Sequence, residues 1–158
     1  MTIQIGDTIP DVTFTTMTED GPEPIGKDFF DGKMVALFAV PGAFTPTCSA
    51  KHLPGFLDKA ADLKAKGIDA IACTSVNDVF VMGAWAKAND AEGVTMLADG
   101  NGAFAEAVGL TMDGSKYGMG KRSQRYSMLI EDGVVKQLNV EAPGEFKVSA
   151  ADYLLGQL

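Results

Sequence analysis

The sequence predicts a single α/β domain in which a central mixed β-sheet is flanked by helices. Short apolar runs alternate with amphipathic helical patterns through most of the chain, and an antiparallel hairpin with a closing helix follows them. The length of 158 residues is typical of one domain that is large enough to bury a core. We therefore expect one domain over residues 1–158.

The alternating part of the chain predicts parallel strands joined by crossover helices. Residues 34–40 are continuously apolar, which is typical of a buried strand. A helical pattern runs from 46 to 66, with an interruption expected at Pro54-Gly55 and an end at Gly67. The same reasoning predicts an edge strand at 12–16, strands at 68–76 and 94–98, and helices at 78–88 and 102–108.

The last part of the chain predicts antiparallel pairing. Residues 111–120 are rich in glycine and are expected to form a loop. The run 125–130, the turn at 131–133 and the returning run 134–140 together predict a hairpin, and an amphipathic helix is expected at 149–158. Parallel strands followed by a hairpin and a closing helix are the order of a thioredoxin-like α/β fold with a mixed sheet.

Composition and charge exclude several kinds of function. Apolar residues make up 46% of the chain and charged residues 22%, as in an ordinary globular domain. The net charge of -8, with no compensating run of Lys or Arg, would repel a phosphate backbone, so we expect no nucleic-acid partner. The longest apolar run is too short to cross a bilayer, and the start lacks a signal-peptide pattern, so no membrane role and a cytoplasmic location are expected.

The two cysteines are expected to be free thiols. Cytosolic reductants keep most disulfides open, so Cys48 and Cys73 are better interpreted as thiols than as a stabilising pair. One histidine and two distant cysteines do not make a metal ligand set, and we expect neither a metal nor a bound cofactor. Any special role of these cysteines is then catalytic or redox-sensing.

Cys48 follows directly after the first predicted buried strand, where open α/β sheets place their chemistry. Thr45 is a good N-cap and Pro46 suits the first helical position, which puts Cys48 in the first turn at N3. Unpaired N–H groups and the positive end of the helix dipole favour a thiolate there. The alternative is that Cys48 is a small core residue, since unpaired cysteines are among the most buried residues.

The residue three positions before Cys48 separates the candidate reactions. A thioredoxin-type disulfide reductase would carry a second cysteine there, but this sequence has Thr45, whose hydroxyl can hydrogen-bond a peroxide oxygen. A general thiol–disulfide oxidoreductase or glutathione transferase is therefore less favoured. A redox sensor or holdase that uses the same thiol only as a signal stays an alternative, and catalytic turnover of peroxide would distinguish the two.

The residues around Cys48 resemble those of the peroxiredoxin family. Pro41, Thr45 and Cys48 match its Pro-x-x-x-Thr-x-x-Cys signature. The strings at 40–49 and 52–56 are similar to the atypical type II, peroxiredoxin-five-like subfamily. Further similarity in content and order covers Asn77-Asp78, Phe80-Val81-Met82, Trp85, Leu97-Ala98-Asp99-Gly100 and Arg125-Tyr126-Ser127-Met128. This resemblance implies a thiol peroxidase that reduces hydrogen peroxide and alkyl hydroperoxides.

The resemblance also implies a role for each matching residue. Cys48 would be the peroxidatic cysteine, Thr45 would hydrogen-bond the peroxide, and Pro41 would shield the sulfur from water. Arg125 would hold the thiolate and polarise the O–O bond, because a fixed guanidinium stabilises the charge that develops on the peroxide oxygens. Taken without the resemblance, Arg125 is better interpreted as a solvated strand-edge residue, and Arg122 is its nearby competitor.

The reaction leaves Cys48 as a sulfenic acid that another thiol must resolve. Cys73 lies within the strand predicted at 68–76, and we interpret it as an inert core residue. Animal relatives carry a resolving cysteine near the C-terminus, but residues 141–158 contain none. The resemblance thus points to the one-cysteine types of bacteria and plants, which are recycled by glutathione with glutaredoxin, or by thioredoxin.

Two further expectations concern His52 and the oligomeric state. His52 lies four residues after Cys48, and a nucleophile–base pair is possible, but packing or a hydrogen bond around the Pro54 kink is favoured. The resemblance implies a homodimer whose interface lies beside the active-site loops. The candidate contributors are three aromatic residues, Phe44, Phe80 and Trp85. The alternative is that these side chains fill the core, and for Trp85, on an apolar helix face, the two interpretations are equally favoured.

Overall fold

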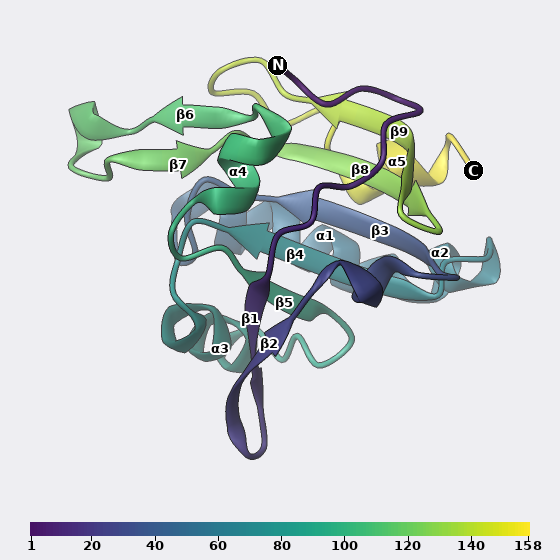
Figure 1. Ribbon diagram of the computed structural model, residues 1–158, viewed down its shortest axis with the longest axis horizontal. Coiled ribbons are helices and arrows are strands. Elements are labelled where there is room, and N and C mark those ends of the chain that lie inside the picture. The colour runs from purple at the N-terminus through teal and green to yellow at the C-terminus, as the bar shows by residue number, and fades with distance from the viewer.

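The computed structural model describes residues 1–158 and shows a seven-stranded mixed sheet with helices on both faces (Figure 1). The strand order is β2-β1-β5-β4-β3-β8-β9. The strands are β1 (Phe14–Thr18), β2 (Gly21–Ile25), β3 (Met34–Ala39), β4 (Ala70–Ser75), β5 (Thr95–Ala98), β8 (Tyr126–Glu131) and β9 (Val134–Val140), with β6 (Thr111–Asp113) and β7 (Lys121–Ser123) in a separate pair. The helices are α1 (Leu53–Asp58), α2 (Ala60–Ala65), α3 (Val79–Ala88), α4 (Ala103–Val108) and α5 (Ala151–Leu155), with short helical turns η1 (Lys27–Phe30), η2 (Cys48–His52) and η3 (Ser115–Tyr117).

The centre of the sheet is built as the sequence predicts. β3, β4 and β5 are parallel neighbours, and β8 pairs with the other side of β3 in the antiparallel sense. β3 is buried on both faces, which explains its continuous apolar run. The thioredoxin-like α/β fold with a mixed sheet is therefore confirmed.

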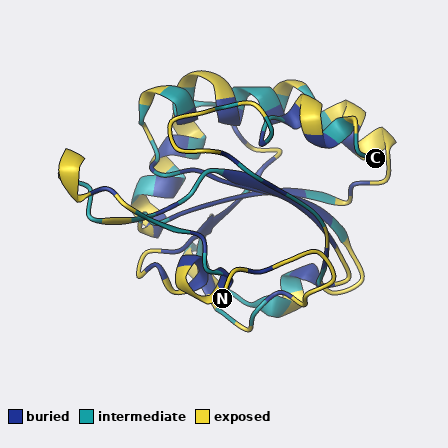
Figure 2. Cartoon of the chain, turned by 90° about the horizontal axis from the view of Figure 1, so that it is seen from above, coloured by how far each residue is buried: buried dark blue, intermediate teal, exposed yellow.

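Two apolar cores cover the two faces of the sheet. One core contains side chains from α1, α2, α3 and α5, including Phe56 and Trp85. The other contains Phe30 of η1, Phe104 of α4 and residues of the N-terminal segment. Figure 2 shows the buried strands between these two layers, whose outer surfaces are exposed. None of the helices has the length and apolar character needed to cross a membrane.

The predicted edge strand at 12–16 corresponds to β1, but β1 is not at the edge. β2 pairs with its outer side in antiparallel register, from Phe14 opposite Ile25 to Thr18 opposite Gly21. β2 contains Pro22 and Pro24, which lack the N–H group that a central strand needs and which are tolerated at an edge. The two prolines explain why the sequence pattern does not predict this strand.

The loop predicted at 111–120 is also wrong in part. Thr111–Asp113 and Lys121–Ser123 pair as β6 and β7 in a two-stranded hairpin that projects from the main sheet (Figure 1). Each strand has only three residues, too few to show a periodic pattern in the sequence. This hairpin matters because one wall of the site is built from it.

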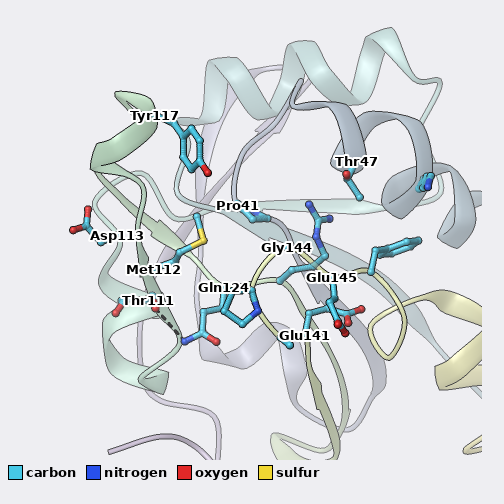
Figure 3. Close-up of a pocket in the computed structure, with 15 residues that line it drawn as sticks. Pro41, Thr47, Thr111, Met112, Asp113, Tyr117, Gln124, Glu141, Gly144 and Glu145 are labelled. Carbon is cyan, nitrogen blue, oxygen red and sulfur yellow. Dashed lines mark hydrogen bonds between the residues drawn. The ribbon is translucent and has the colours of Figure 1, made fainter.

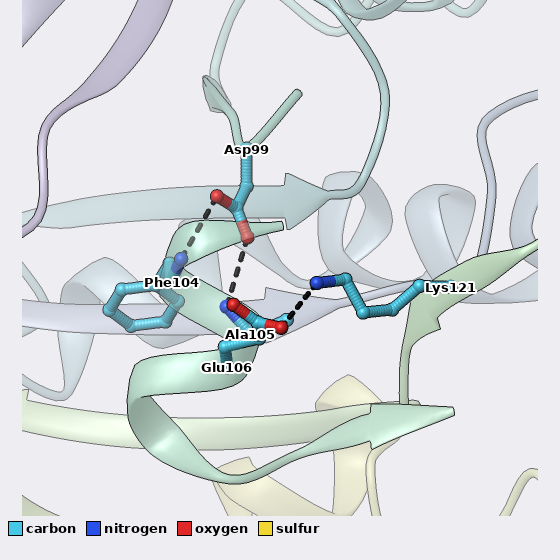
Figure 4. A network of polar contacts seen from close by, with 5 residues as sticks. All are labelled: Asp99, Phe104, Ala105, Glu106 and Lys121. Atoms are coloured by element: carbon cyan, nitrogen blue, oxygen red, sulfur yellow. Dashed lines mark hydrogen bonds and ion pairs between the residues drawn. The ribbon is translucent and has the colours of Figure 1, made fainter. Parts of the chain in front are cut away.

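The hairpin is attached to α4 through β7 (Figure 4). Lys121 of β7 forms an ion pair with Glu106. The carboxylate of Asp99 accepts hydrogen bonds from two amides in the first turn of α4, those of Phe104 and Ala105, at 3.0 and 2.9 Å. These contacts join the hairpin to the end of β5.

Candidate active site

The helix that carries Cys48 begins where the sequence predicts. Ser49 N donates to Thr45 O at 2.9 Å, which makes Thr45 the backbone N-cap and Cys48 the third helical residue. The predicted side-chain cap is not formed, and the Thr45 hydroxyl donates its hydrogen to Gly42 O at 2.6 Å. The segment between β3 and the helix thus brings Pro41, Thr45 and Cys48 together at the carboxyl end of β3.

The helix has a wide turn at Cys48 rather than the break predicted at Pro54-Gly55. Residues 48–52 form a π-helical turn, in which Leu53 N donates to Cys48 O. Pro54 follows at once and has no N–H to donate, while it and Gly55 lie inside α1. The interruption comes later, at Lys59 between α1 and α2. Single π turns inside α-helices are frequent at functional sites.

Arg125, and not Arg122, faces the sulfur. The register of β3 with β8 places Ala39 opposite Tyr126, so that Arg125 lies at the carboxyl end of β3. Its Nη2 donates to Cys48 Sγ at 3.0 Å. Arg122 points elsewhere, donating to the carbonyl oxygens of residues 119 and 76 at 2.8 Å each.

His52 is buried and both of its ring nitrogens are hydrogen-bonded. Nδ1 lies 2.9 Å from Arg125 Nη1, and Nε2 lies 3.0 Å from Ser149 O. Because a guanidinium only donates and a carbonyl only accepts, Nδ1 is the acceptor and Nε2 carries the proton. Burial, helped by the Arg125 charge, lowers the pKa of His52 to about 3, although the Ser149 carbonyl and Glu141 oppose this. The expected hydrogen bond exists, but its partners are not around Pro54, and no bond reaches Cys48.

Glu141, which the sequence analysis missed, holds the loop beside His52. β9 pairs with β8 so that Glu141 N donates to Arg125 O at 3.0 Å. Its Oε2 accepts from Lys147 N, Ser149 N and Ser149 Oγ at 2.6, 2.8 and 2.6 Å. Although burial opposes it, these hydrogen bonds lower the pKa of Glu141 and keep the carboxylate charged. No local sequence pattern signals this role.

Cys73 lies in β4, opposite Phe38 of β3, and is buried in the same core as Cys48. Both cysteines are free thiols. Burial, and then the neighbouring Cys48, raise the pKa of the Cys73 thiol. This environment fits the inert-core interpretation.

A pocket of about 760 Å³ opens beside Thr47, the residue before Cys48, and beside Arg125 (Figure 3). Pro41, Thr47 and Lys51 line it from the Cys48 segment, and Arg125 lies in its wall. Residues of the β6–β7 hairpin and the loop 141–146 complete the lining. The lining carries charges of both signs, from Lys51, Arg125, Asp113, Glu141 and Glu145, so it suits a polar ligand.

The three aromatic residues considered for an interface divide into two kinds. Trp85 is fully buried, and its indole N–H donates to Ser49 Oγ at 2.9 Å, so it belongs to the core. Phe44 and Phe80 are 55% and 66% exposed. Phe44 also has a positive φ of 65°, which is unusual for an aromatic residue.

Comparison with known proteins agrees with this geometry. The Redoxin family model matches residues 4–155. The chain is 49% identical to peroxiredoxin-2E-2, chloroplastic, of Oryza sativa subsp. japonica, over 99% of the chain and 73% of that protein. It is 45% identical to the hybrid peroxiredoxin hyPrx5 of Haemophilus influenzae, over 97% of the chain and 65% of that protein.

A solved structure supports the same assignment. Reduced Prx3 from Vibrio vulnificus, in complex with H2O2, superposes with a TM-score of 0.95 at 52% identity, covering 98% of each chain. The likeness extends over the whole sheet and its helices, including the segment that carries Cys48. The chain therefore belongs to the peroxiredoxin family, in its type II, peroxiredoxin-five-like branch, and is a thiol peroxidase.

Proposed function

We propose that Cys48 is the thiol that reduces the hydroperoxide and that Arg125, Thr45 and Pro41 assist it. The observation that carries the proposal is the 3.0 Å hydrogen bond from Arg125 Nη2 to Cys48 Sγ. A guanidinium at this distance stabilises the negative charge of a thiolate, and the thiolate is the nucleophilic form.

The reaction follows from this geometry. The Cys48 sulfur attacks one peroxide oxygen, the O–O bond breaks, and the sulfur becomes a sulfenic acid. The hydroxide or alkoxide that leaves takes a proton from water. Arg125 stabilises the charge on the leaving oxygen. Pro41 lines the pocket and limits the access of water to the buried sulfur.

Thr45 has a defined direction of hydrogen bonding in this scheme. Its hydroxyl hydrogen is already donated to Gly42 O at 2.6 Å, so the oxygen has only its lone pairs to offer. We infer that Thr45 accepts the hydrogen of the hydroperoxide and so orients the O–O bond towards the sulfur of Cys48.

The test compares the two cysteines under identical conditions. Cys48→Ser should lose catalytic peroxide consumption with an added thiol donor, whereas Cys73→Ser should keep it. Retained turnover in Cys48→Ser contradicts the assignment of the nucleophile. A single stoichiometric reaction of the wild-type protein, without turnover, would instead favour the redox-sensor alternative.

We propose that an external thiol, glutathione with glutaredoxin or thioredoxin, reduces the sulfenic acid. Cys73 is a poor resolving thiol because burial disfavours its thiolate. The pocket of about 760 Å³ can admit a peptide thiol, and Lys51 at its rim forms no salt bridge, which leaves it free for a ligand carboxylate.

Turnover measured with each donor tests the choice of reductant. If glutathione enters the pocket directly, Lys51→Gln should raise the KM for glutathione and leave the rate with peroxide unchanged. Equal turnover with and without both donor systems contradicts the proposal. So does a stoichiometric intramolecular Cys48–Cys73 disulfide, detected by mass spectrometry after one equivalent of peroxide.

We also propose a homodimer and a cytoplasmic location. Phe44 and Phe80 are exposed, and their segments are joined by the hydrogen bond from Ala43 N to Asn77 Oδ1 at 3.0 Å, so two exposed aromatic side chains lie on neighbouring segments near Cys48. The two free thiols fit a reducing compartment. Sedimentation at micromolar concentration should give a dimer that Phe80→Lys weakens, and a monomeric wild-type protein contradicts this proposal.

A further inference from the structure

The side chain of His52 occupies a fully enclosed site behind Arg125. It is 0% exposed, and its ring centroid lies 4.9, 5.7 and 5.1 Å from those of Phe38, Phe56 and Phe146. Its two nitrogens contact Arg125 and Ser149 at 2.9 and 3.0 Å. An imidazole packed among three rings and bonded at both nitrogens is held in one orientation.

Arg125 divides its hydrogen bonds between the sulfur and this imidazole. Nη2 donates to Cys48 Sγ and Nη1 donates to His52 Nδ1. Because the guanidinium is planar and rigid, fixing Nη1 also fixes the direction of Nη2. The Phe146 ring lies near the guanidinium, with Cζ 5.9 Å from the ring centroid, and further restricts its movement.

The acceptor behind Arg125 is neutral, which is uncommon for a half-buried arginine. No carboxylate forms a salt bridge with Arg125. A carboxylate at this place would neutralise the guanidinium and compete with the thiolate for it. A neutral nitrogen lone pair holds the group in place and leaves its positive charge for Cys48 and the peroxide.

We propose that His52 is a positioning residue for the peroxidase reaction: its unprotonated Nδ1 aims the Arg125 guanidinium at the Cys48 sulfur without neutralising it. This inference rests on the proposed roles of Cys48 and Arg125. His52 touches neither the sulfur nor the peroxide and acts only through Arg125.

The contacts of Ser149 and Glu141 fix the tautomer that this role requires. Ser149 O accepts the Nε2 proton, which leaves the Nδ1 lone pair directed at Arg125. Ser149 is itself held by two hydrogen bonds from its amide and hydroxyl to Glu141 Oε2, at 2.8 and 2.6 Å. Glu141 is bonded through its amide to Arg125 O. The segment from Glu141 to Ser149 therefore contacts Arg125 directly at one end and, through His52, at the other.

A matched pair of variants separates the two ends of the imidazole. In His52→Asn, the amide oxygen can replace Nδ1 as the acceptor for Arg125, and the donor to Ser149 is lost. In His52→Gln, the amide nitrogen can replace Nε2 as the donor to Ser149, and the acceptor for Arg125 is lost. Both variants lose one buried hydrogen bond, so we expect comparable losses of stability.

The readout is the second-order rate constant with hydrogen peroxide in a single turnover, followed by the fluorescence of Trp85, which contacts Ser49 beside Cys48. We expect His52→Gln to be slower than wild type by about tenfold to a hundredfold, and His52→Asn to stay within about threefold. In an Arg125→Gln background, His52→Gln should cause no further loss. Equal rates for the two variants, or an additive loss in the double variant, overturn the inference.

The unmodified protein provides a second measurement, because His52 is its single histidine. Nitrogen NMR of the reduced protein at neutral pH should show one protonated ring nitrogen, Nε2, and an unprotonated Nδ1. A doubly protonated ring, or the opposite tautomer, overturns the inference. The proposed function fails separately: wild-type rates in Arg125→Gln or Cys48→Ser would remove that proposal, whatever the NMR result.

Discussion

The surroundings of Cys48 and Cys73 differ in one decisive respect. Both residues are free thiols, both are 0% exposed, and both belong to the same apolar core. Cys48 lies in the first helical turn after β3 and has Arg125 Nη2 3.0 Å from its sulfur. Cys73 lies within β4, where burial raises its pKa. In the proposed mechanism, the directed cation at the end of a strand, and not burial, distinguishes the reactive thiol from the inert one.

Removing that cation should make the two cysteines alike. We expect Arg125→Gln to lower the rate constant of Cys48 with hydrogen peroxide by at least about a hundredfold, because both the thiolate and the leaving oxygen lose their stabilising charge. Arg122→Gln is the matched control, since it removes an arginine that bonds only backbone carbonyls. A similar loss in both variants, in stopped-flow measurements, contradicts the difference between the two sites.

Lowering the pH should destabilise the fold, because the unfolded chain takes up a proton at His52, the residue that accepts a hydrogen bond from Arg125. The pKa of His52 is about 3 in the fold and near 6.5 when unfolded, so the unfolded state binds more protons between these values. The free energy of unfolding should then fall by about 1.4 kcal/mol per pH unit as the pH drops below about 6.5. Glu141, with its lowered pKa, adds to the loss at lower pH.

Denaturant unfolding between about pH 7 and about pH 4 measures this effect, because this range begins above the unfolded pKa of histidine and ends well below it. His52→Gln should have a shallower dependence than wild type. Identical slopes for the two proteins would show that His52 binds protons equally in the folded and unfolded states, which contradicts a buried imidazole held in its neutral form by the fold.

We expect a smaller effect on the rate from Thr45, the proposed hydrogen-bond acceptor for the hydroperoxide. Thr45→Val removes the acceptor for the hydroperoxide and should slow the reaction with peroxide by about tenfold. Thr45→Ser retains the hydroxyl and should recover most of the rate. If Thr45→Val and Thr45→Ser react equally fast, the hydroxyl only shapes the loop through its bond to Gly42.

Cys73 should give the smallest effect on activity. Cys73→Ala leaves a small cavity in the core and should lower the free energy of unfolding by about 1 to 2 kcal/mol. Peroxidase turnover with the same donor should change by less than about threefold, because the sulfur of Cys73 takes no part in the proposed cycle. A larger loss of turnover at unchanged stability would assign Cys73 a role in resolution.

The sequence predicted the parts of the structure that local signals determine. The start of the helix at Thr45 follows from the order of N-cap, proline and cysteine, and β3 follows from its apolar run. β2 was missed because its two prolines argue against a strand, and β6 and β7 because three residues show no period. Tertiary pairing compensated for these weak local signals.

The site was predictable only in part. The motif around Cys48 is contiguous, whereas Arg125 was selected by family resemblance, and it is the β3–β8 register that separates it from Arg122. His52 finds partners 73 and 97 residues away, in Arg125 and Ser149. No local pattern can specify contacts between segments so distant, and for the same reason Glu141 went unnoticed.

The most direct test of the central claim is the ionisation of Cys48 in the reduced protein. Ultraviolet absorbance of the thiolate, followed from acid to alkaline pH in wild type, Cys48→Ser and Arg125→Gln, reports which sulfur is charged. We expect thiolate absorbance in the wild-type protein at neutral pH, which disappears in Cys48→Ser and is largely lost in Arg125→Gln. A Cys48 that is protonated at neutral pH, or whose ionisation does not respond to removal of Arg125, contradicts the central claim.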